Sequence, residues 1–183
     1  MTLTRPVTTL EAYHAFIDAT ENADRLFELI DGEIIEKMPS FEPSRIAMRI
    51  GRLIGNFIDN HDLGDVTGAD GGYILPDGAV LIPDVGYISK ARMPDKPERE
   101  VPVPPDFAVE VKSPTDAKRA LRVKAERYMA AGTQMVWLVF PENREVEVYL
   151  NGQDVFSVGN DGELSGGDVL PGFTLPVSAI FPV

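Results

Sequence analysis

A carboxylate and an ammonium group stand two residues apart in the segment DFAVEVK, residues 106–112. If this segment is a strand, Glu110 and Lys112 project from the same face, because successive side chains of a strand alternate. A second acid, Asp84, follows Pro83 in another apolar run, AVLIPDVGYI. On a neighbouring strand, Asp84 is expected to lie close to Glu110, and two carboxylates so close raise each other's pKa values unless a cation lies between them.

Mg²⁺ or Mn²⁺ suits such a pair, because both ions take oxygen ligands and Mg²⁺ typically binds one or two carboxylates together with a substrate phosphate. A metal held there polarises a scissile phosphate and lowers the pKa of a bound water. Lys112 is then expected to act on the attacking water or to neutralise the charge that develops on phosphorus. Each part also has a structural interpretation, since E-x-K is often a solvated strand face and Pro-Asp is often a turn.

Further polar residues are expected to complete this site. Lys124 and Tyr128 lie four residues apart, so they share one face of a predicted helix. If that face covers the strand that bears Glu110, both side chains can support the site or contact a phosphate. Either Glu28 or Glu33, in the early segment RLFELIDGEIIEKMP, is expected to supply another metal-binding carboxylate.

Hydrophobic spacing and turn signals predict the elements that position these residues. The predicted helices cover residues 9–19, 43–60 and 113–132, and the predicted strands cover residues 64–75, 106–112, 134–141 and 144–150. Asp31 and Gly32 are the turn of a predicted hairpin. Ser113 is expected to cap the third helix, with Asp116 at the capping-box position, and Gly132 is expected to end it.

The composition predicts one globular domain spanning residues 1–183. The chain has no cysteine, which excludes disulfides and thiolate metal sites, and its start lacks the apolar core of a signal peptide. A soluble cytoplasmic protein that does not associate with membranes is therefore expected. The net charge of −12 and the pI of about 4.5 count against tight nonspecific binding to nucleic acid.

The order of several motifs resembles a known family. These are ELIDGEI, PDVGYI, FAVEVKSP, K-x-x-x-Y-x-x-x-G, VWLVFP and the closing VLPGFTLPVSAIF, which together run from Glu28 to Phe181. They are similar to the Uma-type restriction-endonuclease family within the PD-(D/E)xK nuclease superfamily. Two positions depart from the pattern: EPSRIAMRI lacks the His that many relatives carry at the start of the second helix, and Phe140 replaces an Asp.

The resemblance implies an α/β restriction-endonuclease-like fold, in which a mixed central sheet is flanked by helices. It implies a Mg²⁺- or Mn²⁺-dependent endonuclease that acts on DNA, with Asp84, Glu110 and Lys112 as the core of the site. Lys124 and Tyr128 match helix residues typical of the family. A catalytically silent binding module of the same fold is the alternative, which the acidic pI favours. A homodimer is expected, because an enzyme that cuts both strands can use two sites and two-fold dimers are the commonest oligomers.

Overall fold

The computed structural model describes residues 8–93 and 95–181. Its centre is a six-stranded sheet with the order β10-β9-β8-β7-β6-β3, in which only β7 and β8 run parallel among the described pairs. The strands of this sheet are β3 (Gly64–Thr67), β6 (Val85–Ser89), β7 (Phe107–Val111), β8 (Met135–Phe140), β9 (Glu145–Leu150) and β10 (Phe156–Gly159). This is the mixed central sheet that the family resemblance implies.

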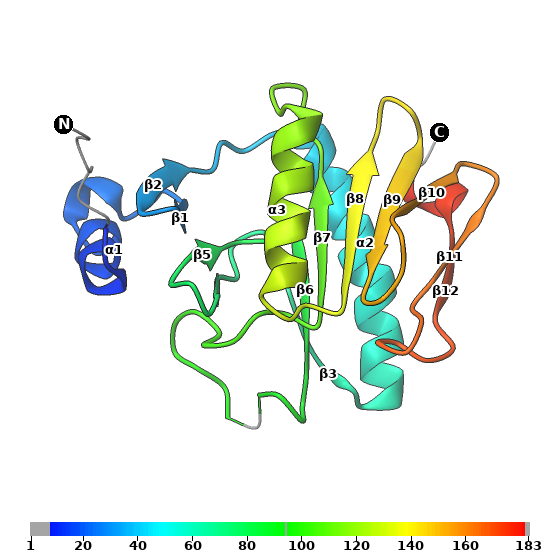
Figure 1. The fold of residues 1–183 in the computed structure, drawn as a ribbon, viewed down its shortest axis with the longest axis horizontal. Helices are drawn as coiled ribbons and strands as arrows, with labels where there is room; N and C mark the ends of the chain where they lie inside the picture. The colour runs from blue at the N-terminus through cyan, green and yellow to red at the C-terminus, as the bar shows by residue number, and fades with distance from the viewer. Residues whose placement is uncertain (1–7, 94, 182–183) are drawn as a thin grey trace.

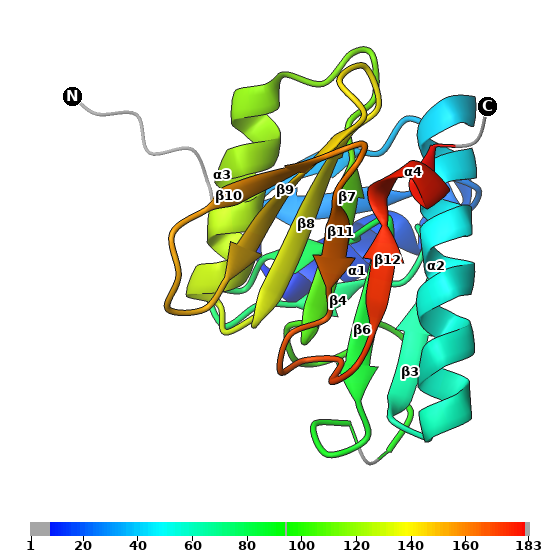
Figure 2. The ribbon, with the colours of Figure 1, turned by 90° about the vertical axis from the view of Figure 1, so that its right-hand side faces the viewer.

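Two helices cover opposite faces of this sheet, α2 (Phe41–His61) and α3 (Lys118–Ala130). Figures 1 and 2 show the three layers, with α3 on one side of β7 and β8 and α2 on the other. The apolar residues of α2 recur at three- and four-residue steps and are buried against β6, β7, β8 and β9. Among them, Ile50 and Ile54 are completely buried.

The unit β7–α3–β8 carries most of the predicted site residues. All five residues of β7 and all six of β8 are buried, as expected for central strands covered on both faces. The helix begins at Lys118, four residues after Pro114, the first helical residue that a cap at Ser113 predicts. Residues 113–116 instead form a turn, in which the Ser113 amide donates to the Asp116 carboxylate and the Asp116 amide donates to the Ser113 carbonyl. The predicted end is confirmed, because Gly132 follows the helix with a φ of +103°.

A second sheet, with the order β2-β1-β5-β4, lies beside the first. Its strands are β1 (Phe27–Ile30), β2 (Glu33–Glu36), β4 (Tyr73–Ile74) and β5 (Val80–Leu81). Asp31 and Gly32 both have positive φ values, 52° and 73°, so the predicted turn joins β1 to β2 as a tight hairpin. The hairpin brings Glu28 towards α3.

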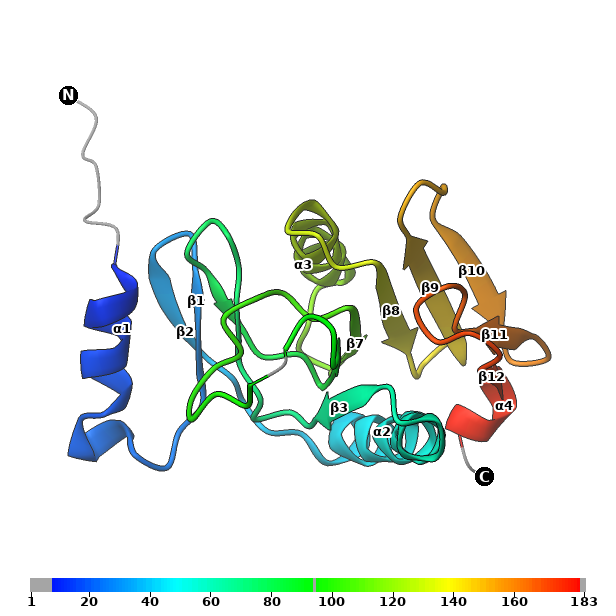
Figure 3. The same cartoon turned by 90° about the horizontal axis from the view of Figure 1, so that it is seen from below.

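The first and last described helices, α1 (Leu10–Ile17) and α4 (Val177–Ile180), lie at opposite ends of the molecule, as Figure 3 shows. The first helix, α1, packs on the β1–β2 hairpin and is capped by the Thr9 hydroxyl. A short antiparallel pair, β11 (Glu163–Ser165) and β12 (Thr174–Pro176), is followed by α4, which contacts α2. Within the described residues, no helix is long and apolar enough to span a membrane.

Candidate active site

A cavity of about 960 Å³ opens between α3 and the segment that joins the hairpin to α2. Glu28 on β1, Asp84 before β6 and Glu110 on β7 all line it. Asp84 therefore sits in the link between β5 and β6, where the chain passes from one sheet to the other, and not at the end of a single long strand. Because Asp84 and Glu110 open to the same cavity, their carboxyl groups lie on one side of the central sheet.

Lys124 joins two of these carboxylates. Its Nζ lies 2.7 Å from Oε1 of Glu28 and 2.7 Å from Oε1 of Glu110. Both acids are almost completely buried, with exposed fractions of 6% and 5%. Tyr128, one helical turn later on α3, donates its hydroxyl to the same Glu110 oxygen at 3.2 Å. The structure thus brings the predicted helix residues Lys124 and Tyr128 to Glu110.

Asp84 is held by both backbone and side-chain contacts. Its amide donates to the Val109 carbonyl, and its Oδ2 accepts from the Val111 amide at 2.7 Å. Its Oδ1 lies 3.2 Å from Nζ of Lys37, which also donates to the Ile82 carbonyl at 2.7 Å. These contacts fix Asp84 beside the end of β7, near Glu110.

The environment of Glu110 favours its neutral form. Burial raises the pKa of Glu110 to about 7, and the charges of Asp84 and Glu28 act in the same direction, while Lys124 opposes them. Burial acts to lower the pKa of Lys124, but the charges of Glu110 and Glu28 outweigh it, and the pKa is raised. The result is a permanent ammonium group between two carboxylates, one of which titrates near neutral pH.

Two predicted residues are placed differently. Lys112 does not stand beside Glu110: its Nζ donates to the Ser113 carbonyl at 3.0 Å and lies 3.6 Å from Oε1 of Glu142. The Lys112 amide still donates to the Val139 carbonyl of β8 at 2.9 Å, but the Lys112 side chain contacts Ser113 and Glu142, and no contact with Glu110 is present among the described residues. Glu33 is exposed at the start of β2 and is not among the residues that line the cavity, whereas Glu28 lines it.

The donor set suits a hard divalent cation that needs few protein ligands. Asp84 and Glu110 supply carboxylate oxygens, with Glu28 close by, and Mg²⁺ typically binds one or two carboxylates while it keeps several waters. The Lys124 ammonium already supplies one positive charge between Glu28 and Glu110. The set is small, because within residues 8–93 and 95–181 no group of three or more His, Cys, Asp or Glu is arranged to hold a metal.

Among the residues that line the cavity, Lys37 and Arg119 are cations that the sequence predictions did not single out. Lys37 follows β2 directly, and nothing in the local pattern marks it, because its partner Asp84 is far away along the chain. Arg119 lies in the first turn of α3, exposed at the edge of the cavity. Arg119 and Val123 are four residues apart on one side of the helix, and both line the cavity. The four-residue spacing is therefore the sequence signal that could have placed Arg119 at the site.

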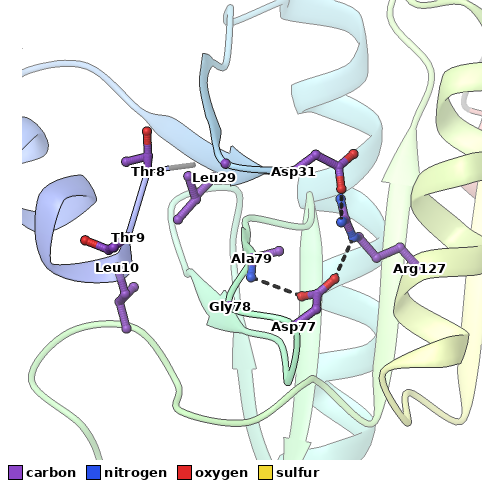
Figure 4. A pocket seen from close by; sticks show the side chains of 10 residues that line it. Thr8, Thr9, Leu10, Leu29, Asp31, Asp77, Gly78, Ala79 and Arg127 are labelled. Atoms are coloured by element: carbon purple, nitrogen blue, oxygen red, sulfur yellow. Dashed lines mark hydrogen bonds and ion pairs between the residues drawn. The ribbon is translucent and has the colours of Figure 1, made fainter. Parts of the chain in front are cut away.

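A second cavity, of about 570 Å³, lies beside the hairpin turn. Figure 4 shows Arg127 reaching from α3 to Asp31 of the turn and to Asp77. The threonines at the start of α1 form its other side. The two acids that line this cavity, Asp31 and Asp77, are both paired with Arg127. These ion pairs connect the hairpin to α3, and we assign no reaction to this cavity.

Comparisons with known proteins agree with this architecture. The Uma2 family model, described as "Putative restriction endonuclease", matches residues 10–178. A solved structure from Anabaena variabilis ATCC 29413, described as a putative nuclease belonging to DUF820, has a TM-score of 0.80 at 21% sequence identity. The match covers 94% of this chain and 97% of that chain, and it confirms the predicted fold. None of the curated proteins matches the chain.

Proposed function

Because this chain belongs to the Uma2 family of restriction-endonuclease-like proteins, we propose that it is a divalent-metal-dependent endonuclease that hydrolyses phosphodiester bonds of DNA. The observation that carries the proposal is the pair of buried acids, Glu28 and Glu110, that shares the Lys124 ammonium. Asp84 lies beside them on the same cavity. Burying this many charged groups costs free energy of folding, so their presence favours a functional role for the cluster.

In this proposal, Asp84 and Glu110 hold a Mg²⁺ or Mn²⁺ ion, and Glu28 is a further acid close to it. When bound, the ion polarises the scissile phosphate and lowers the pKa of a water. The remaining roles belong to the chain itself. Lys124 neutralises negative charge that develops on the phosphate, and Tyr128 holds the Glu110 carboxylate in place through its hydroxyl.

Lys124, and not Lys112, is the lysine that we assign to the reaction. Lys124 contacts two of the acids, whereas Lys112 is paired with Glu142 outside them. A side chain on α3 can occupy the place expected for the lysine of E-x-K, because α3 lies over the face of β7 that bears Glu110. Lys37, beside Asp84, is a second ammonium at the other end of the site.

The test is an assay of DNA cleavage with the full chain. Supercoiled plasmid is incubated with Mg²⁺, with Mn²⁺ and with EDTA, using wild type, Glu110→Ala and Glu110→Gln. The matched control is Glu126→Ala, which removes an exposed acid of α3. We expect cleavage by wild type and by the control, none in EDTA, and a loss of at least about a thousandfold in the Glu110 variants, because a bound metal supplies several kcal/mol.

If wild type leaves plasmid, single-stranded DNA and RNA intact with both metals, the proposal is wrong. The alternative is a catalytically silent binding module, which is favoured by the small donor set and by the ammonium that already lies between two of the acids. Calorimetry with Mn²⁺ separates the two functions. A nuclease gives a heat of binding that Glu110→Gln removes, whereas a silent module gives none.

A further inference from the structure

The described chain has few cations available for a ligand. Within residues 8–93 and 95–181, every lysine and arginine side chain except Arg52 and Arg119 makes a hydrogen bond or an ion pair with another part of the chain. Arg52 is exposed on α2, away from the cavity, and Arg119 is exposed at the cavity edge. One unpaired guanidinium group therefore faces the candidate active site.

This distribution disfavours tight binding of a DNA duplex. Proteins that bind duplex DNA through its charge commonly contact roughly 6–10 phosphates with lysine and arginine. Here the cations are already neutralised by carboxylates, and the net charge of the chain is −12. The phosphate contacts that hold a duplex are largely absent from the described surface, so the binding free energy of a nucleic acid has to come from its bases.

The rim of the cavity is suited to bases. Four large apolar side chains that line it are exposed: Leu26 (41%), Ile35 (44%), Met38 (75%) and Val123 (56%). Leu26, Ile35 and Met38 belong to the hairpin and the segment after it, and Val123 belongs to α3 on the opposite wall. Bases of a duplex are stacked and paired, and only unpaired bases can place their faces against such walls.

Arg119 lies beside the apolar rim. It precedes Val123 by four residues and Arg127 by eight, so the three lie in one row along α3. The neighbouring row contains Lys124 and Tyr128 and is more deeply buried. The outer row thus presents an unpaired cation next to an apolar side chain, directly above the row that contacts Glu110.

We propose that the cavity takes an unpaired stretch of single-stranded DNA, with bases against the apolar rim and a flanking phosphate on Arg119. The inference rests on the proposed nuclease function and narrows its substrate to DNA that is not base-paired at the site of cleavage. A single strand needs only one active site, so this substrate also removes the reason for expecting a dimer.

The test measures binding in EDTA, where no cleavage occurs. A fluorescently labelled oligonucleotide is titrated with the full chain, as a single strand and annealed to its complement, and anisotropy is recorded at several salt concentrations. We expect the single strand to bind at least about tenfold more tightly than the duplex, because only unpaired bases can reach the apolar rim, and tenfold corresponds to about 1.4 kcal/mol.

Arg119→Ala and Arg52→Ala form a matched pair, because both remove an exposed and unpaired arginine. Arg119→Ala is expected to weaken single-strand binding and to reduce the slope of log K against log salt by about 0.7, the value for one phosphate contact on a single strand. Arg52→Ala is expected to change neither. Val123→Ser is expected to weaken binding with no change in the salt slope.

Duplex binding as tight as single-strand binding overturns the inference, as does an equal effect of the two arginine variants. A wrong substrate and a missing nuclease activity give different results. A chain that cleaves plasmid but prefers duplex is still a nuclease and refutes only the substrate. A chain that binds the single strand through Arg119 but never cleaves it, with either metal, refutes the nuclease and keeps the binding site.

Discussion

The two faces of β7 have opposite chemical character. Towards α2, the strand presents Phe107, Val109 and Val111 to a large apolar core. Towards α3 it presents Ala108, which joins a smaller apolar core, and Glu110, whose partners are Lys124 and Tyr128. Both faces are buried, but only one contains ionisable groups.

The face of β7 towards α2 is expected to supply most of the stability, and the face towards α3 is where the chemistry is expected. Apolar burial contributes about 25 cal/mol per Å² and has no directional demands, so the α2 face can be filled with Ile, Val and Phe. Buried charges lose their hydration, and even a well-paired set is seldom more stable than an apolar replacement. A polar cluster on the α3 face therefore fits a functional demand, and variants on each face should affect different measurements.

The largest effect on stability is expected on the apolar face. Ile50→Ala removes a completely buried side chain of α2, and a change of this kind costs about 2–5 kcal/mol. Urea unfolding measures this loss. DNA cleavage per folded molecule should stay at the wild-type level, because Ile50 is in the core on the other side of the sheet. A selective loss of cleavage in Ile50→Ala would show that the two faces are not separate.

The polar face should show the reverse behaviour, with a stability that depends on pH. The folded chain keeps a proton on Glu110 up to about pH 7, while the ordinary value of 4.5 applies to the unfolded chain. Between these values the folded state binds more protons, so the free energy of unfolding falls as the pH rises, and above pH 7 this contribution is constant.

Glu110→Gln removes that titration. In metal-free buffer the variant should gain stability over wild type from pH 4.5 to pH 7, by up to about 3 kcal/mol, since one pKa unit corresponds to about 1.36 kcal/mol. Glu126→Gln, an exposed acid of α3, is the control and should follow the wild-type curve. Parallel curves for Glu110→Gln and wild type would contradict the buried, titrating carboxyl group.

The two lysines give a direct comparison within the polar face. Lys124→Met is expected to reduce cleavage per folded molecule about a hundredfold, the lower range for loss of one group that stabilises developing charge. Lys112→Met removes an ammonium paired with Glu142 and should change cleavage less than about threefold. A larger loss of cleavage in Lys112→Met than in Lys124→Met would assign the reaction to Lys112, as the E-x-K spacing indicates.

The smallest effect is expected where the hairpin joins α3. Arg127→Ala breaks the ion pairs with Asp31 and Asp77 that hold the hairpin turn. We expect a loss of about 1 kcal/mol in stability and a modest fall in cleavage, because Glu28 lies on the same hairpin. Arg122→Ala, which breaks the ion pair between Arg122 of α3 and Glu147 of β9, should leave cleavage unchanged. Equal cleavage in both variants would mean that the position of Glu28 does not depend on the ion pairs of Arg127.

Local spacing of residues was enough to predict the main elements of the layers. The apolar stripe of α2, the uninterrupted apolar run of β8 and the Asp31–Gly32 turn each depend on neighbours in the sequence, and each is present where the pattern predicts it. The start of α3 was not predicted correctly, because the reciprocal bonds between Ser113 and Asp116 form a turn before the helix begins.

By itself, the sequence predicted that Asp84, Glu110, Lys124 and Tyr128 form one group, from the alternation along a strand, the helical spacing and the family resemblance. Only the tertiary structure decided which ammonium contacts the acids, which of Glu28 and Glu33 lines the cavity, and that Lys37 pairs with Asp84. The physical reason is that ion pairs act over a few ångströms in space. The partners here lie on separate elements, and Lys112 is paired with Glu142 in the turn after β8.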